Sequence, residues 1–119
     1  MIRLLRCIKK RDDISDMEFR RFWESAEYND IFTSYVNASE GISVQMNLVL
    51  KIDLNNHIQM MRGTQEPYDG IIELFWPSAK SAAALLSTAK GKQLIIELAQ
   101  YENQFVDITH SSISITESS

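Results

Sequence analysis

Residues 42–52 read ISVQMNLVLKI, and they hold the most regular pattern in the chain. Apolar side chains take every second position, and mostly polar side chains lie between them. Successive side chains of a strand point to opposite faces of a sheet, so the pattern predicts a strand with one strongly apolar face. The apolar positions are Ile42, Val44, Met46, Leu48, Leu50 and Ile52.

A second strand is expected downstream, separated from the first by a long connection. Residues 71–76 (IIELFW) are apolar and stop at Pro77, which cannot continue a ladder of hydrogen bonds. Residues 53–67 contain Gly63 and Pro67 and show no clear period. We expect them to form a connection that acts as a lid, as an arm contacting a partner or as a mobile segment.

Upstream of residue 42 the pattern predicts a strand followed by a helix. Residues 2–9 are rich in apolar side chains and end at the polar cluster 10–13, as in a strand. Ser15 and Glu18 form the signature of a capping box, so a helix begins there. Its apolar stripe is Phe19, Phe22, Trp23 and Ala26. A second helical piece is indicated by Ile31, Phe32, Tyr35 and Val36.

The last third of the chain predicts further helix and a final strand. Ser78 is a candidate N-cap for a helix, and Gly91 is expected to interrupt that helix. Residues 110–116 alternate again and predict the last strand. The first of these helices is marked by Ala79, Ala82, Ala83 and Leu86, and the second by Leu94, Leu98, Tyr101 and Phe105.

The predicted order is β-α-β-β-α-β, which places the chain in the α+β class. The right-handed crossover rule folds this order into a four-stranded antiparallel sheet with both helices on one face. The expected strand order is last, first, third, second. One sheet face then stays bare, so we expect a homodimer through the sheet faces.

Length and composition limit the functions to consider. The 119 residues suit one domain, 1–119, and the net charge of −4 makes nucleic acid an unsuitable partner. The single cysteine, Cys7, excludes an intramolecular disulfide and a cluster of cysteine ligands. No apolar run approaches the ~20 residues that cross a bilayer, and no secretion signal is apparent. We therefore expect a cytoplasmic protein without a membrane partner.

Several short segments together resemble the EthD-like family of the dimeric α+β barrel superfamily, which has the ferredoxin-like fold. The segments are residues 15–23 (SDMEFRRFW), 68–76 (YDGIIELFW), 90–92 (KGK) and 105–107 (FVD). The resemblance implies a homodimer whose sheets face each other across a cavity. It also implies relatives such as cofactor-independent monooxygenases and polyketide cyclases or dehydratases. The family's helix histidine is replaced here by Glu27.

Four residues are candidates for catalysis in such a cavity. Arg6 and Glu73 fall on neighbouring central strands and are expected to form an ion pair, either catalytic or simply structural. His110, on the polar face of the last strand, has the side chain best matched to proton transfer near neutral pH. Glu27 is a candidate base if burial raises its pKa, and otherwise a solvated helix residue.

Other polar and aromatic residues are candidates for ligand binding. They are Gln45, Asn47, Tyr28, Tyr68, Phe75 and Ser112. The two histidines, His57 and His110, are far apart in the sequence and lack ligand spacing, so no metal is expected. No glycine-rich phosphate loop occurs, so no nucleotide cofactor is expected either.

Two functional hypotheses follow from these residues and the resemblance. The first is a small cofactor-independent enzyme that acts on a hydrophobic oxygenated organic molecule by oxidation, cyclisation or dehydration. Its acid or base candidates are Glu73, His110 and Glu27, and Arg6 is the electrostatic stabiliser. The second is a non-catalytic ligand-binding or accessory protein of an oxidative degradation or biosynthetic pathway.

Overall fold

The four strands form one antiparallel sheet in the order β2-β3-β1-β4 in the computed structural model, which describes residues 1–117. The predicted strand order and α+β class are confirmed. β1 lies at the centre, and Ile2 is opposite Trp76 on one side and Glu117 on the other. The strands are β1 (Ile2–Ile8), β2 (Ser43–Leu48), β3 (Gly70–Trp76) and β4 (Ser112–Glu117).

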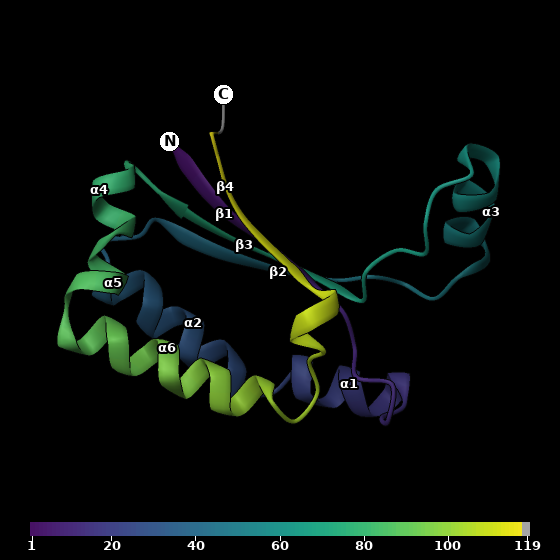
Figure 1. The fold of residues 1–119 in the computed structure, drawn as a ribbon, viewed down its shortest axis with the longest axis horizontal. Helices are drawn as coiled ribbons and strands as arrows, with labels where there is room; N and C mark the ends of the chain where they lie inside the picture. The colour runs from purple at the N-terminus through teal and green to yellow at the C-terminus, as the bar shows by residue number, and fades with distance from the viewer. Residues whose placement is uncertain (118–119) are drawn as a thin grey trace.

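The helices α2, α5 and α6 lie along one side of the sheet (Figure 1). The predicted capping box at Ser15 is present, since its hydroxyl accepts from the Glu18 amide and the Glu18 carboxylate accepts from the Ser15 amide. The helices are α1 (Asp16–Trp23), α2 (Ala26–Ala38), α3 (Asp53–Arg62), α4 (Ala79–Ala82), α5 (Ala84–Ser87) and α6 (Ala89–Glu102). A short 3-10 helix, η1 (Ile108–His110), precedes β4.

The core lies between the sheet and these helices. Alternation along β1 and β3 places Ile8, Ile72 and Leu74 on the covered face, where each is almost fully buried. The opposite face has no helix over it in the part of the chain that the structure describes (Figure 1). Its central strands present Arg3, Leu5, Cys7, Ile71, Glu73 and Phe75, all partly exposed. We call this surface the open sheet face.

The predicted strand 42–52 is too long, and the predicted connection 53–67 contains a helix. β2 ends at Leu48, and one further bond follows in the register of the ladder, from the Val49 amide to the Asp69 carbonyl (2.9 Å). The chain then leaves the sheet and forms α3, which ends at Gly63 in the left-handed conformation (φ 66°). We call residues 49–69 the arm.

Gly91 lies inside α6 rather than at a helix interruption, which corrects the sequence prediction. The break falls earlier, at Thr88, whose hydroxyl accepts from the Gly91 amide (3.0 Å) and caps α6. Gly91 is needed because a Cβ there would lie 2.5 Å from the Leu85 carbonyl oxygen. A glycine thus allows α5 and α6 to pack closely.

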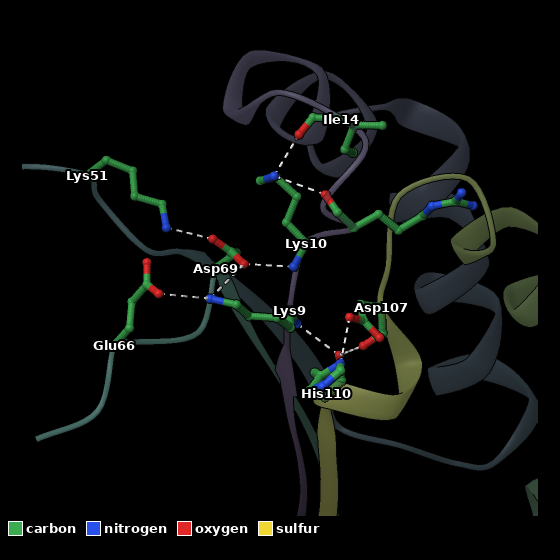
Figure 2. A network of polar contacts seen from close by, with 10 residues as sticks. Lys9, Lys10, Ile14, Lys51, Glu66, Asp69, Asp107 and His110 are labelled. Carbon is green, nitrogen blue, oxygen red and sulfur yellow. Dashed lines mark hydrogen bonds and ion pairs between the residues drawn. The ribbon is translucent and has the colours of Figure 1, made fainter.

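A buried carboxylate, Asp69, joins both ends of the arm to the residues that follow β1 (Figure 2). Its Oδ1 accepts from Lys51 Nζ (2.6 Å), and its Oδ2 accepts from the Lys10 amide (2.7 Å). Lys9 Nζ lies 3.8 Å from Asp69 and 3.8 Å from Glu66. Lys51 lies near the start of the arm and Asp69 ends it, so the two ends of the arm are joined where it leaves the body.

The Asp69 cluster predicts a loss of stability in acid. Burial raises the pKa of Asp69, but hydrogen bonds from Lys51 and Lys10 and the lysine charges outweigh it, so the pKa is lowered from 3.8. The stabilisation is therefore complete above the unfolded pKa and is lost as pH falls through the lower folded pKa. We expect Asp69→Asn to cost about 1–3 kcal/mol at pH 7. We also expect the free energy of unfolding of this variant to decrease less steeply than that of the unmodified chain as the pH falls below about 4.

Urea unfolding at a series of pH values between 2 and 7 measures both effects. The exposed Asp12→Asn serves as the control, because Asp12 lies outside the cluster. An acid-limb slope in Asp69→Asn equal to that of the unmodified chain would contradict the prediction.

Candidate functional site

A cavity of about 710 Å³ lies between the covered face of the sheet and the helices α4, α5 and α6. Strands β1 and β4 form one wall and α6 forms much of the other. Ile113 and Ile115 of β4 are exposed, because no helix packs over that edge of the sheet in the described residues. Most of the lining is apolar and includes Ile2, Leu4, Trp76, Leu85, Ile95 and Leu98.

Two charged side chains, Arg6 and Glu102, interrupt the apolar wall of this cavity. Arg6 donates from Nη1 to Glu102 Oε2 and from Nη2 to Glu102 Oε1, each at 2.8 Å. The residues are only 7% and 4% exposed, so the pair is buried. Bidentate geometry of this kind is the strongest form of the arginine–carboxylate pair.

Tyr28 completes this cluster by donating its hydroxyl to Glu102 Oε2. Burial, followed by the charge of Glu102, raises the pKa of Tyr28, so the phenol remains a neutral donor. Burial lowers the pKa of Arg6, but hydrogen bonding to Glu102 and its charge outweigh that effect and leave the pKa raised. The cluster therefore holds one cation and a neutral phenol around one carboxylate acceptor.

Secondary structure explains why these three residues meet. Arg6 shares the covered face of β1 with Leu4 and Ile8, since alternate residues of a strand point the same way. Glu102 is the last residue of α6, and Tyr28 lies in the first turn of α2. The cluster thus joins a central strand to two helices that are distant in the sequence.

The predicted ion pair between Arg6 and Glu73 is wrong. The register places Leu5, not Arg6, opposite Glu73, so Arg6 and Glu73 point to opposite sides of the sheet. Glu73 instead accepts from Arg3 Nη1 at 2.8 Å on the open sheet face. Asn47 Nδ2 lies 3.4 Å from the same carboxylate.

His110 does not belong to the last strand, contrary to prediction. It ends η1, where its exposed ring lies 2.7 Å from Asp107 Oδ2 (Figure 2). The predicted alternation began too early, because the Ser111 amide donates to the Ile108 carbonyl (3.3 Å) and closes a turn before β4. Hydrogen bonds from Thr109, then from His110, lower the pKa of Asp107.

The remaining sequence candidates lie on several surfaces. Glu27 is exposed in α2, and Tyr68 is exposed near the end of the arm. Gln45, Asn47 and Phe75 belong to the face opposite the cavity. Ser112 borders the cavity at the start of β4, but its position opposite Cys7 places its side chain on the open sheet face. Among the candidates, the structure therefore brings together Arg6 and Tyr28.

Glu102 is the central site residue that the sequence interpretation missed. A usable signal was present, because Glu102 follows Leu94 and Leu98 at a spacing of four residues. Residues four apart share a helix face, so a carboxylate on this buried stripe requires a partner. Within residues 1–117, Arg6 and Tyr28 are the side chains that donate to it.

No helix among residues 1–117 has the length and apolar character needed to cross a lipid bilayer. No group of three or more His, Cys, Asp or Glu side chains in the same range is arranged to hold a metal ion.

Comparison with known proteins supports the fold alone. No protein-family model matches the chain, and no curated protein matches it. A dimeric protein of unknown function with a ferredoxin-like fold from Bacteroides fragilis is similar in structure (TM-score 0.64). It is 8% identical, and the match covers 98% of this chain and 95% of that one. A hypothetical Arabidopsis thaliana protein has a TM-score of 0.57 at 12% identity, over 99% and 88% of the two chains.

Proposed function

We propose that this ferredoxin-like chain is a homodimer that binds one hydrophobic, oxygenated organic molecule in the cavity of each protomer. The observation that carries the proposal is the buried Arg6–Glu102 pair in the wall of an otherwise apolar cavity. The EthD-like assignment and a single domain over residues 1–119 remain parts of this proposal.

The size and lining of the cavity support a small-molecule ligand. Pockets that enclose such ligands usually measure roughly 300–1,000 Å³ and combine apolar walls with a few polar groups. The volume here is about 710 Å³. Leu98 and Trp76 offer apolar contact to the body of the ligand, and Arg6 offers polar contact to one end.

The charge state of the pair indicates the chemical class. Arg6 and Glu102 neutralise each other, so a neutral oxygen suits this wall better than an ion does. A guanidinium carries about five N–H donors, of which Glu102 accepts from two nitrogens. We therefore propose that a ketone, hydroxyl or ester oxygen of the ligand accepts from Arg6.

The open sheet face supports the homodimer. Leu5, Cys7, Ile71 and Phe75 are the apolar side chains of its central strands, beside the Arg3–Glu73 ion pair and between polar side chains of β2 and β4. Covering these four apolar side chains with a second sheet would stabilise the fold. The Bacteroides fragilis neighbour is described as dimeric.

We predict binding of a neutral carbonyl probe with a defined dependence on the pair. The probe is 6-propionyl-2-dimethylaminonaphthalene, whose fluorescence reports polarity at its ketone. Hydrogen bonds to charged groups contribute about 1.5–3 kcal/mol. We expect binding to weaken by roughly tenfold to a hundredfold in the double variant Arg6→Met/Glu102→Leu, which removes both charges together.

A second variant tests whether the probe occupies the cavity. Ala99 lines the cavity from α6, so Ala99→Phe should fill the space and prevent binding. Ala26→Phe, at an exposed site on α2 outside the lining, is the matched control. Equal binding to Ala99→Phe and Ala26→Phe would contradict the proposal, as would failure of the unmodified chain to bind the probe.

A second candidate function is chemical conversion of the bound molecule, favoured by the Tyr28–Glu102 hydrogen bond beside the cavity. Arg6 would stabilise negative charge that develops on the ligand oxygen, and Tyr28 would keep the carboxylate oriented. Native mass spectrometry of protein purified without added ligand identifies a retained molecule, whose conversion is then followed over time. Catalytic roles for Glu73, His110 and Glu27 stay predictions for the same assay.

A further inference from the structure

The arm projects beyond the end of the sheet, on the side away from α2 and α6 (Figure 1). The radius of gyration is 15.2 Å, whereas a compact chain of this length is expected to measure roughly 13.5 Å. No residue of α3 is buried. The arm therefore lies beyond the end of the sheet, and α3 contributes no buried residue to the core.

The helix of the arm carries an apolar stripe. Leu54, Ile58 and Met61 follow one another at spacings of four and three residues, so they share one helix face. They are 62%, 51% and 70% exposed. Isolated helices shorter than about 12–15 residues are marginal in water, and α3 has 10 residues. A partner that covers the stripe would supply the missing stabilisation.

The two ends of the arm are held together at its root. Lys51, near one end, donates to the buried carboxylate of Asp69 at the other end, and that carboxylate also accepts from the Lys10 amide of the body. The segment entering α3 and the segment leaving it therefore start from one point (Figure 2). These bonds therefore hold the two ends of the arm together where it leaves the end of the sheet.

The open sheet face offers a limited footprint to a dimer. Four strands about 4.8 Å apart and up to 7 residues long give a face of roughly 20 by 23 Å in projection. The accessible surface of side chains on such a face is larger than this projection, and a standard interface buries about 800 Å² of accessible surface on each partner. The arm, which projects from the end of the sheet, would add its exposed apolar side chains to this interface.

The charge of the arm favours a protein surface over a membrane or nucleic acid. Lys51 and Arg62 are outnumbered by Asp53, Glu66 and Asp69, so the arm carries no excess of basic residues. Helices that bind anionic membranes usually carry many basic residues on the polar side.

We infer that the stripe formed by Leu54, Ile58 and Met61 packs on a second copy of this chain, alongside the partner's open sheet face. The arms of the two copies then clasp the dimer from both ends. This inference rests on the homodimer proposed above. It adds the segment that completes the interface.

Sedimentation velocity over a range of concentrations tests the inference. We expect the unmodified chain to be a dimer and Ile58→Glu/Met61→Glu to weaken dimerisation by at least about a hundredfold, since two charges would be buried. Asn56→Glu/Gln59→Glu is the matched control, because it adds the same charge away from the stripe. The control should remain a dimer.

Binding of the naphthyl ketone probe shows whether each variant is folded, because the cavity is on the other side of the sheet. Amide hydrogen exchange gives a second measure: residues 53–62 should be protected in the dimer and exchange rapidly in the stripe variant.

The possible results separate the two proposals. A monomeric unmodified chain at all concentrations would overturn both the homodimer and the role of the arm. A dimer that survives the stripe variant with unchanged exchange would overturn the role of the arm alone. Vesicles of phosphatidylcholine are tested with both chains. If the unmodified chain binds the vesicles and the stripe variant stays dimeric but does not bind them, the partner of the stripe is a lipid surface and the inference is overturned.

Discussion

Glu102→Leu is expected to lower the free energy of unfolding by about 3–5 kcal/mol, because it leaves the Arg6 guanidinium buried without its counter-charge. Tyr28 loses its acceptor in the same variant. At roughly 4 °C for each kcal/mol in a chain of this length, the midpoint of thermal unfolding should fall by about 12–20 °C.

A double variant separates loss of the pair from isolation of a charge. Arg6→Met/Glu102→Leu removes both ions, and such replacements are often neutral or stabilising. We expect it to recover most of the stability lost in Glu102→Leu, and addition of Tyr28→Phe to recover more. Glu97→Ala, on the more accessible part of α6, should change stability by less than about 0.5 kcal/mol. A double variant no more stable than Glu102→Leu would contradict this account of the cluster.

Phe105→Ala is expected to lower the free energy of unfolding by about 3–5 kcal/mol, as in other large-to-small core substitutions. Phe105 is fully buried, stacks on Phe22 of α1 with ring centroids 5.0 Å apart, and meets Tyr28 of α2 edge-on at 5.1 Å. Its ring also lies 5.6 Å from Tyr101 of α6. The cavity left by alanine would therefore loosen three helices at once.

Urea unfolding followed by near-ultraviolet circular dichroism measures this effect, because it reports the packing of the aromatic rings. Met17→Ala provides the control on α1, where Met17 is exposed. Phe105→Leu keeps much of the volume and should lose less stability than Phe105→Ala. A loss below about 1 kcal/mol in Phe105→Ala would contradict the prediction, because it would show that the surrounding rings move to fill the space left by the substitution.

The sheet was predictable because each strand is marked in the sequence, β2 and β4 by alternation and β1 and β3 by short apolar runs, although the turn at Ile108–Ser111 moved the start of β4. The capping box at Ser15 was equally clear, since both of its hydrogen bonds are local. The arm was not predictable in the same way. Leu50 and Ile52 continue the alternation of β2, but the Leu50 carbonyl accepts from Asn55 Nδ2 (2.6 Å) and the Ile52 carbonyl accepts from the Asn55 amide (3.1 Å), so both residues lead into α3 instead of extending the strand.

The candidate site was only partly predictable, because a one-residue difference in register exchanges the two faces of a strand. Arg6 was identified from its charge, but the register decides on which face of the sheet it lies. Leu5 is opposite Glu73, so Arg6 lies on the covered face. Its partner, Glu102, comes from the end of a helix that packs beneath the sheet. Sequence spacing alone does not bring those two positions together.

The central position of β1 has a consequence for the order in which the chain is made. β1 is the first strand to be synthesised, yet its neighbours are β3 and β4, and the partner of Ile2 on the second side is Glu117. Pairing over such separations is slow, because the closure of long loops precedes the gain from contacts. The chain must therefore be almost fully synthesised before its first strand acquires both neighbours. Until then, that apolar strand is exposed to aggregation and to chaperones on the ribosome.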